Sequence, residues 1–406
     1  MKITTELLGD HPELTAIDCG LPITASWIRG GEGFIGFGTY RSHTVTGAKR
    51  FTDAQAWWRE QLSQLDIKNN VHGSGTGPIL FASFAFDESE PSELLIPEVV
   101  VSQKGDRAWV TWIGDHQPQL TEAGAESGSH KFTWSKGSLS DIAWCERVEE
   151  SIERIKRGEL EKVVLARDEV ATSNSTIEIR PLLRSLQSEY PSTWLYLVDG
   201  LVGATPELLV RLNKTLVTSR VLAGTIRRTG DDERDLALAG SLAKSSKDLE
   251  EHEYAVRSVA QALAPFASST NVPETPFVLH LPNVMHLATD VTGVINESVA
   301  QIDLFTLTAA LHPSAAVCGT PTETARNVIN EVESLNRGRY AGPVGWIDAR
   351  GDGEFGIALR CGQLSQDRRS IRLFAGCGIV AGSDPAQELA ESQAKLAPVK
   401  SALTRI

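Results

Sequence analysis

The sequence has 406 residues, of which 41% are hydrophobic and 22% are charged, a composition typical of a soluble globular protein with two or three domains. Its formal net charge of −13 argues against nucleic acid and anionic membrane as partners, so a local basic cluster would have to capture any anionic substrate. Scattered cysteines, the lack of an apolar run of about 18 residues and an N-terminus without an apolar stretch predict reduced thiols and a cytoplasmic protein.

Residues 1–140 contain few informative patterns. Apolar runs at 78–86 and 107–114 predict short strands, and residues 52–65 predict a helix. The segment 121–139 is polar and rich in Gly and Ser, which favours a linker. We therefore look for the chemistry of the protein in residues 141–406.

From residue 141 the periodicity becomes clearer. Asp141 is predicted to cap a helix whose apolar face begins at Ile142 and which ends at Gly158. The remaining pattern predicts strands at 162–171, 193–200, 202–228 (turning at 213–214) and 284–295, helices near 181–187 and at 231–245, 247–264, 299–311 and 322–334, and a hairpin across 340–364 that turns at 351–353. Adjacent strands with grouped helices favour an α+β fold.

The segment 376–395, GCGIVAGSDPAQELAESQAK, predicts a glycine-rich strand end followed by a helix, with Asp384 as N-cap and proline in the first turn. At about 100° per residue, Glu388, Glu391 and Lys395 lie on one stripe of this helix, beside its apolar stripe. Two carboxylates and an ammonium could hold a cation and an anionic ligand together. The alternative is an ordinary surface ion pair between Glu391 and Lys395.

Two further residues are candidates for acid–base chemistry. Lys162 opens an apolar strand, where burial would lower its pKa and allow it to act as a general base. Glu207 lies between a proline and an apolar run, surroundings that raise a carboxyl pKa and suit a general acid. Taken alone, Lys162 is better explained as a solubilising edge-strand residue and Glu207 as a solvent-facing turn residue.

The acidic stretch KDLEEHE, which starts at Lys247, offers a metal ligand. Glu251 shares a helical row with Ala255 and Val259, so it is the glutamate of this stretch that is positioned to face the interior. Together with Glu391 it would supply two hard oxygen ligands, which suit Mg²⁺. Zinc is disfavoured because no HExxH or Cys/His spacing occurs.

Other groups could bind a carboxylate. Arg360 could hold one with its two-pronged guanidinium, and Tyr340 could donate a hydrogen bond. Backbone N–H groups can approach an anion at Gly376–Gly378 and at the Ala-Gly-Thr of 223–225, and His286 adds a polar group to a strand. Each of these is also explained as an ordinary structural or surface residue.

Nine segments, in this order, resemble motifs of the chorismate-utilising enzymes and, within them, of the isochorismate synthases. They are KVVLAR (162–167), TPELLV (205–210), LAGTIRR (222–228), SKDLEEH (246–252), MHLAT (285–289), HPSAAVCGTP (312–321), GRYAGPVGWID (338–348), ALRCGQL (358–364) and LFAGCGIVAGSDPAQELAESQAKL (373–396). They cover roughly residues 141–396, whereas residues 1–140 match no motif.

The resemblance implies one large α+β domain with stacked, mainly antiparallel β-sheets flanked by helices. Residues 1–140 would be an N-terminal part of this fold, and residues 141–406 the chorismate-binding catalytic region. A deep cleft would bind Mg²⁺ and chorismate. We expect a monomer with no nucleic-acid or membrane partner.

Carried over motif by motif, the resemblance also implies roles for individual residues. Lys162 would be the base that activates water for attack on ring carbon 2, and Glu207 the acid that protonates the hydroxyl leaving carbon 4. Glu251 and Glu391 would hold Mg²⁺, with Glu388 acting through water. The substrate would be lined by Gly224, Thr225 and Lys395 near the ring carboxylate, by His286 and Ala316 in the ring pocket, and by Tyr340, Arg360, Gly376 and Gly378 at the enolpyruvyl carboxylate.

Three positions distinguish the branches of this family. Lysine at 162 and alanine at 223 point to water as the nucleophile, because ammonia-using members tend to carry glutamine at the first position and the aminodeoxychorismate branch carries lysine at the second. Ala316 resembles the isochorismate synthases, whereas salicylate synthases usually carry threonine there.

We therefore expect a Mg²⁺-dependent isochorismate synthase, whose product could feed menaquinone or siderophore biosynthesis. The first alternative is a salicylate synthase, which would go on to eliminate pyruvate. An ammonia-using anthranilate or aminodeoxychorismate synthase component and a non-catalytic metabolite binder are further alternatives.

Overall fold

The structure, a computed structural model, describes residues 1–124, 130–296 and 302–406, and of Lys247 and Glu251 it describes the backbone alone. The first residues of the helix predicted at 299–311 therefore lie outside the described residues. In the part of the chain that is described, no helix combines the length and the apolarity that crossing a bilayer requires.

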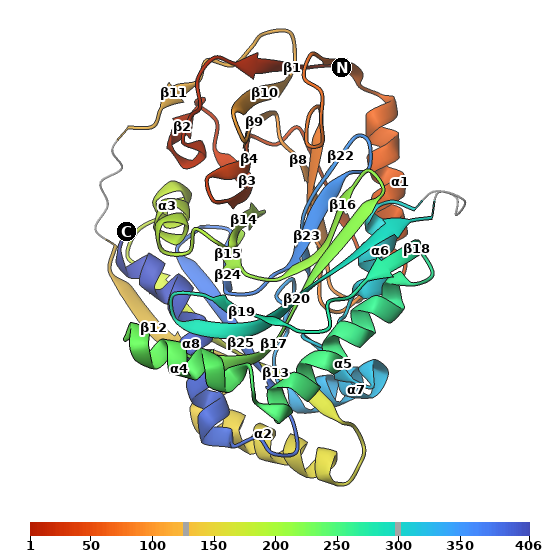
Figure 1. The fold of residues 1–406 in the computed structure, drawn as a ribbon. Coiled ribbons are helices and arrows are strands. Elements are labelled where there is room, and N and C mark those ends of the chain that lie inside the picture. Colours follow the sequence, from red (N-terminus) through yellow and green to blue (C-terminus); the bar gives the residue numbers. More distant parts are fainter. Residues whose placement is uncertain (125–129, 297–301) are drawn as a thin grey trace.

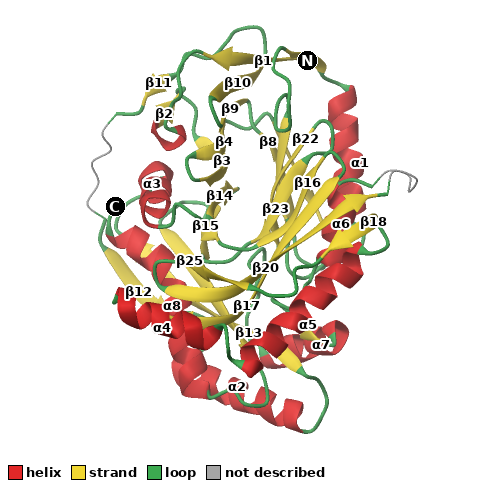
Figure 2. Ribbon diagram, viewed as in Figure 1, coloured by secondary structure: helices red, strands yellow, loops and turns green. Residues whose placement is uncertain are grey.

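Two large β-sheets pack face to face, and helices lie at the periphery (Figures 1 and 2). The rings of Phe34 in the larger sheet and Trp346 in the smaller one lie 4.5 Å apart, centroid to centroid. Across the same interface Trp27 Nε1 donates a hydrogen bond of 2.9 Å to Glu354 Oε2. Aromatic side chains of the two sheets therefore contact one another in a core that is otherwise mainly aliphatic.

The larger sheet has 13 strands. Along the sheet they are β12 (Phe132–Lys136), β13 (Lys162–Ser173), β25 (Ser370–Ile379), β24 (Cys361–Leu364), β15 (Leu201–Thr205), β14 (Trp194–Val198), β3 (Ile23–Arg29), β4 (Glu32–Phe37), β9 (Val99–Lys104), β10 (Arg107–Ile113), β1 (Lys2–Leu8) and β6 (Asp66–Asn69), while β21 (Gly319–Thr320) pairs with β13.

The smaller sheet has 10 strands. They are β18 (Ala267–Asn271), β20 (Val284–Ile295), β17 (Leu216–Arg227), β16 (Leu208–Asn213), β23 (Gly353–Ile357), β22 (Pro343–Asp348), β7 (Ile79–Ser83), β8 (Ser92–Ile96) and β5 (Arg41–Val45), while β19 (Phe277–His280) pairs with β20. A separate pair joins β2 (Ile17–Asp18) to β11 (Thr121–Glu122).

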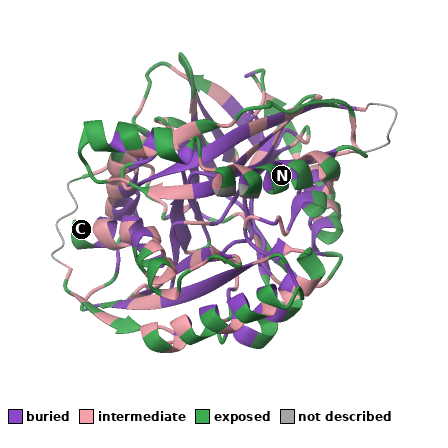
Figure 3. Ribbon diagram, turned by 60° about the horizontal axis from the view of Figure 1, so that its bottom comes forward, coloured by how far each residue is buried: buried purple, intermediate pink, exposed green. Residues whose placement is uncertain are grey.

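The described helices are α1 (Arg50–Ser63), α2 (Asp141–Lys156), α3 (Ile179–Glu189), α4 (Asp232–Leu242), α5 (Ser246–Leu263), α6 (Leu304–Leu311), α7 (Thr322–Val332) and α8 (Pro385–Thr404), with a short 3-10 turn at Leu14–Ala16. Helices α3 and α8 bury Leu186, Leu396 and Val399 against the outer face of the larger sheet. Figure 3 shows buried residues concentrated in the strands, while the outer faces of the helices are exposed.

Residues 1–140 supply strands to both sheets. In the larger sheet β3 pairs with β14, and in the smaller one β7 pairs with β22. These two pairings and that of β12 with β13 are antiparallel ladders, so three strand pairs join the first 140 residues to the rest of the chain.

The predicted α+β class with mainly antiparallel sheets is confirmed: the long pairs β13–β25 and β17–β20 are antiparallel, and β1–β6 is a parallel exception. The helix at 52–65 and the helix capped by Asp384 are also confirmed, and Asp384 Oδ1 accepts a 2.9 Å hydrogen bond from the backbone N–H of Gln387.

Four local predictions were wrong. Ser140, and not Asp141, caps α2, and Ile142 is 75% exposed. The predicted linker contains β12, which pairs with β13 at the sheet edge. The predicted hairpin across 340–364 contains β22 and β23 only, because the chain then leaves the smaller sheet and forms β24 in the larger one.

Candidate active site

A cavity of about 270 Å³ is lined by residues of both sheets and of helices α5 and α8. Its lining includes most residues that the sequence singled out: Lys162, Glu207, Gly224, Thr225, His286, Ala316, Tyr340, Arg360, Gly376, Gly378, Glu388, Glu391 and Lys395. The remaining candidate, Glu251, lies on α5, and its side chain is outside the described residues. The fold thus gathers groups that are up to 233 positions apart in the chain, since 395 − 162 = 233.

Two connections that cross between the sheets carry Glu207 and Arg360. Pro206 and Glu207 lead from β15 in the larger sheet to β16 in the smaller one, and Leu359 and Arg360 lead back from β23 to β24. The crossings are hydrogen-bonded side by side, because the N–H of Ile357 donates to Glu207 O (3.1 Å) and the N–H of Ala204 donates to Arg360 O (3.2 Å). Arg360 has a φ of 51°, the sharp turn that a change of sheet requires here.

Glu207 is an acid held away from water. Its residue is 6% exposed, and burial raises the pKa of its carboxyl to about 8. The positive charges of three neighbours oppose this rise: Lys162, Arg360 and Lys395. At neutral pH the Glu207 carboxyl is therefore largely protonated and available as a proton donor.

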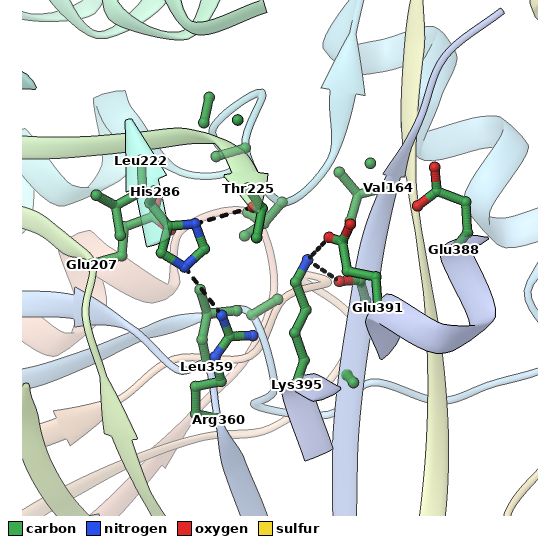
Figure 4. Close-up of a pocket in the computed structure, with 18 of the residues that line it drawn as sticks. Val164, Glu207, Leu222, Thr225, His286, Leu359, Arg360, Glu388, Glu391 and Lys395 are labelled. Carbon is green, nitrogen blue, oxygen red and sulfur yellow. Dashed lines mark hydrogen bonds and ion pairs between the residues drawn. The ribbon is translucent and has the colours of Figure 1, made fainter. Parts of the chain in front are cut away.

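His286 links Thr225 of the smaller sheet to Arg360 at the sheet crossing through its ring nitrogens (Figure 4). Its Nδ1 lies 3.0 Å from Thr225 Oγ1, and its Nε2 lies 3.3 Å from a terminal nitrogen of Arg360. Because a guanidinium can only donate, Nε2 must accept, so the ring proton sits on Nδ1 and points to Thr225. Burial, with the charges of Arg360 and Lys395, lowers the pKa of His286 well below its usual value, which keeps the ring neutral.

A β-bulge places Thr225 opposite His286. The pairing of β17 with β20 shifts between Ala223 and Thr225, and the residue between them, Gly224, has a φ of 77°. A Cβ atom at Gly224 would lie 3.2 Å from Asp248 Cβ and 3.3 Å from Leu287 Cδ1. Both the backbone conformation and the close contact with α5 therefore favour glycine at this position.

Helix α8 contributes a charged pair to the opposite wall. Lys395 Nζ lies 2.6 Å from Glu391 Oε1 and donates a 2.9 Å hydrogen bond to the carbonyl oxygen of Gly376 on β25. Burial opposes both charges, but their mutual attraction outweighs it, so the pKa of Lys395 is raised and that of Glu391 is lowered. In Figure 4 this pair lies on one side of His286 and Arg360, and Glu207 lies on the other.

The residues that face Glu391 fit a magnesium ion. The carboxylates of Glu388 and Glu391 and the thiol of Cys377 lie within 4.8 Å of one another. Burial raises the pKa of Cys377, and its Sγ donates to the backbone oxygen of Glu388 at 3.3 Å, so the thiol is not an anionic ligand. The donors left are two carboxylates, the type that Mg²⁺ prefers while it keeps several waters.

Tyr340 and Phe374 form the floor of the cavity below β25. Their rings stack 5.2 Å apart at an interplanar angle of 10°. A Cβ atom at Gly376 would lie 2.9 Å from the Tyr340 hydroxyl, so glycine there leaves room for the phenol. Burial raises the pKa of Tyr340, so the hydroxyl stays protonated and can donate a hydrogen bond.

Lys162 and Ala316 line the cavity from β13 and from the loop that follows α6. Lys162 is the first residue of β13 and pairs with Thr320 of β21. Ala223, 8% exposed, also lines the cavity, so position 223 faces the site, as the comparison of family branches assumes.

Sequence reasoning missed two charged residues of the lining, Asp248 and Arg337. Asp248 lies three residues before Glu251 on α5, so it shares the inward stripe and could have been found from helical spacing. Arg337 gave no such signal, because one of its partners, Val164 O, is 173 positions away in the chain.

Comparisons with known proteins cover most of the chain. The family model described as chorismate binding enzyme matches residues 29–404. The chain is 32% identical to the isochorismate synthase MenF of Bacillus subtilis over 381 residues, covering 86% of this chain and 80% of that protein. It is 36% identical to the isochorismate synthase DhbC of the same organism over 334 residues, covering 78% and 79%.

A solved structure shares the fold. MenF, the menaquinone-specific isochorismate synthase from Escherichia coli, superposes with a TM-score of 0.81 over 99% of this chain and 94% of that chain. Its sequence is 24% identical, so this likeness concerns the arrangement of the chain.

Proposed function

The chain belongs to the chorismate-binding enzyme family, and from this membership together with the geometry of the cavity we infer that it is an isochorismate synthase. It interconverts chorismate and isochorismate by adding water at ring carbon 2 and releasing the hydroxyl of carbon 4. The observation that carries this inference is that a protonated carboxyl, Glu207, and the amine-bearing side chain of Lys162 line the same cavity.

The cations explain how an acidic protein binds an anionic substrate. Chorismate carries two carboxylates, whereas the chain has a formal net charge of −13. Arg360 and Lys395 line the cavity and form the local basic cluster that the composition required. Arg360 and the Tyr340 hydroxyl would hold the enolpyruvyl carboxylate, and Lys395 would lie near the ring carboxylate.

The reaction needs two proton transfers, one from the water that attacks carbon 2 and one to the hydroxyl that leaves carbon 4. Lys162 Nζ would take a proton from the attacking water, and the protonated Glu207 would give a proton to the departing hydroxyl, so that water leaves. In the reverse direction the two groups exchange these tasks. His286, neutral and fixed by Thr225 and Arg360, would line the ring without competing for protons.

We propose that Mg²⁺ is required and that Glu388 and Glu391 hold it, with Glu251 as a further ligand. The carboxylate pair on α8 supports this proposal. The ion would neutralise the ring carboxylate and fix the substrate in the cavity.

We propose that the protein acts as a monomer. The five cysteines are free, which supports a reducing compartment such as the cytoplasm.

The test is a product assay. Purified protein is incubated with chorismate and Mg²⁺, and separately with isochorismate, and the products are separated by reversed-phase chromatography. We expect both reactions to approach the same mixture of the two compounds. Accumulation of salicylate and pyruvate, or of an amino-substituted product when ammonia is added, would contradict the proposal.

A further inference from the structure

Strand β13, which begins at Lys162, has a gap along one edge. Its inner edge pairs with β25 from Val163 to Thr172. Its outer edge pairs with β21 at Lys162 and Val163, and with β12 from Glu169 to Ser173. Between these two, at residues 164–168, no described strand pairs with the outer edge. Buried backbone groups there need other partners.

Side chains supply those partners. A terminal nitrogen of Arg337 donates to Val164 O at 2.7 Å, and Glu333 Oε1 accepts from the N–H of Ala166. Trp144 Nε1 donates to Ala166 O at 3.1 Å. Together with the carbonyl oxygen of Cys318, which accepts a 2.8 Å hydrogen bond from the N–H of Val164, three side chains therefore replace a neighbouring strand here.

Glu333 and Arg337 form a buried, two-pronged ion pair. Arg337 Nε lies 2.8 Å from Glu333 Oε2, a terminal nitrogen lies 3.2 Å from Oε1, and the two side chains are 4% and 1% exposed. The guanidinium also stacks 4.2 Å above the ring of Phe86. A charge pair this deeply buried is held rigidly, because either group alone would be costly to bury.

The same guanidinium reaches the facing loop. Its other terminal nitrogen donates to Val317 O at 2.9 Å, next to Ala316. Val164, Val317 and Ala316 all line the cavity. One arginine thus ties the strand that carries Lys162 to the loop that carries Ala316.

We propose that Arg337, held in place by Glu333, is a positioning residue that sets Lys162 relative to the ring pocket. The inference rests on the proposed function, because it assigns the base to Lys162. Arg337 is not required to touch the substrate, because four of its five N–H donors bind Glu333, Val164 O and Val317 O.

Lysine cannot replace arginine in this role. An ammonium on a flexible stem keeps the positive charge next to Glu333, but it lacks the planar fork that reaches a carboxylate and two carbonyl oxygens in fixed directions. The start of β13 would then shift, and a displacement of about 1 Å at a reacting group lowers the rate by about 100-fold.

Arg337→Lys is the test variant, and Arg339→Lys is its matched control. Arg339 is two residues away, its side chain is 8% exposed, and its guanidinium also binds two backbone oxygens, Val198 O at 3.0 Å and Asp199 O at 2.7 Å. It does not line the cavity. For both variants, kcat and KM for chorismate, the affinity for chorismate by calorimetry and the melting temperature are measured at saturating Mg²⁺.

We expect Arg337→Lys to lose about 10- to 100-fold in kcat with KM and affinity changed less than about threefold, because the carboxylate-binding groups are untouched. Arg339→Lys should keep kcat within about threefold while losing similar thermal stability. If Arg337→Lys does not fold, Glu333→Gln, which keeps an oxygen for Ala166 N–H but not the charge, is judged by the same criteria.

Equal kcat values in the two arginine variants would overturn the positioning role and leave the proposed function intact. A loss that appears in KM and affinity, with kcat preserved, would also overturn it. Absence of turnover in the unsubstituted chain would contradict the proposed function itself, and the positioning role with it.

Discussion

Residues 1–140 and residues 141–406 both contribute strands to the two sheets, but they differ in what they contribute to the cavity. The first region supplies β3, β4, β9, β10, β1, β6 and β12 to the larger sheet and β7, β8 and β5 to the smaller one. The cavity, in contrast, is lined only by residues between Lys162 and Lys395. The family motifs have the same distribution, since all nine lie in the second region.

The difference shows what each task demands of a sequence. A strand that covers a core needs alternating or continuous apolar residues, and many sequences meet that need. A site needs particular groups at particular backbone positions, such as a glycine with positive φ at 224 or an acid at a sheet crossing. Motifs therefore mark the second region, and the first shows only its apolar pattern.

Residues 1–140, as far as the structure describes them, do not line the cavity, but some of them pack against the segments that carry its lining residues. A Cβ atom at Gly356 would lie 3.0 Å from Trp27 Cη2 and 2.9 Å from Glu207 O, so the indole of β3 packs directly against the crossing that carries the acid. Phe86 lies under Arg337 in a similar way. These contacts predict that the first region affects the rate through stability and packing, not through chemistry.

The largest effect on turnover is expected at Lys162. Lys162→Ala should lower kcat by about 10³-fold because the proton of the attacking water loses its acceptor. The melting temperature should hardly change, since Lys162 is the first residue of its strand. Lys156→Ala on α2, which removes an exposed lysine paired with Glu153, is the control and should keep full activity. Activity of Lys162→Ala within tenfold of the unsubstituted chain would remove Lys162 as the base.

Glu207→Gln should lower kcat by about 10²-fold, because the leaving hydroxyl loses its proton donor. In the unsubstituted chain the acid must be protonated, so kcat/KM should fall as pH rises through about 8. This fall of kcat/KM at high pH should be absent from the pH profile of Glu207→Gln. If kcat/KM of the variant falls with pH in the same way, the titrating group is not Glu207.

Stability against pH gives an independent reading of Glu207. The folded-state pKa is raised above the unfolded value, so the folded chain holds the proton more tightly between these values. Stability from this group is therefore fully present below the unfolded pKa, near 4.5, and is lost as pH rises through about 8. Glu207→Gln should thus gain melting temperature relative to the unsubstituted chain at pH 9, and little at pH 5.

Removal of a proposed metal ligand should lower turnover less, and added Mg²⁺ should restore it. Glu388→Gln should raise the Mg²⁺ concentration for half-maximal rate by about tenfold, with turnover restored at high Mg²⁺. Mg²⁺-induced stabilisation in thermal unfolding should weaken in parallel. Glu153→Gln, on the exposed face of α2, is the control. A Mg²⁺ requirement identical in both variants would exclude Glu388 from the metal site.

The smallest effect on turnover is expected in the first region. Ile35 in β4 is fully buried, and Ile35→Ala should cost about 2–5 kcal/mol of unfolding free energy. The kcat of the folded fraction, measured well below the melting temperature, should be unchanged. Leu7→Ala, at a position 57% exposed, should alter stability by less than about 0.5 kcal/mol. If Ile35→Ala changed the pH dependence of kcat/KM, residues 1–140 would take part in the chemistry, and the proposed division between the two regions would be wrong.

Local signals in the sequence were sufficient for some elements. Helix α8 was predicted because Asp384 and Pro385 are a strong start signal within four residues. Ser140 and Asp141 are both good caps and stand side by side, so the sequence could not choose between them.

Long-range features needed the resemblance or the structure. Spacing alone could not bring Lys162 and Glu207 to one cavity, because the sheet crossings that do so involve strands far apart in the chain. The burial of Glu207 was a reasonable expectation from its apolar neighbours, whereas the backbone partners of Arg337 depend on a gap in strand pairing that no local pattern reveals.

The central claim is that solvent water enters at carbon 2 while the hydroxyl of carbon 4 leaves, and oxygen-isotope labelling tests it most directly. Chorismate is incubated with the protein and Mg²⁺ in ¹⁸O-water, and the products are analysed by mass spectrometry and ¹³C NMR. The account predicts isochorismate with ¹⁸O at carbon 2 and, through the reverse reaction, recovered chorismate with ¹⁸O at carbon 4. Isochorismate that contains no solvent oxygen would contradict it.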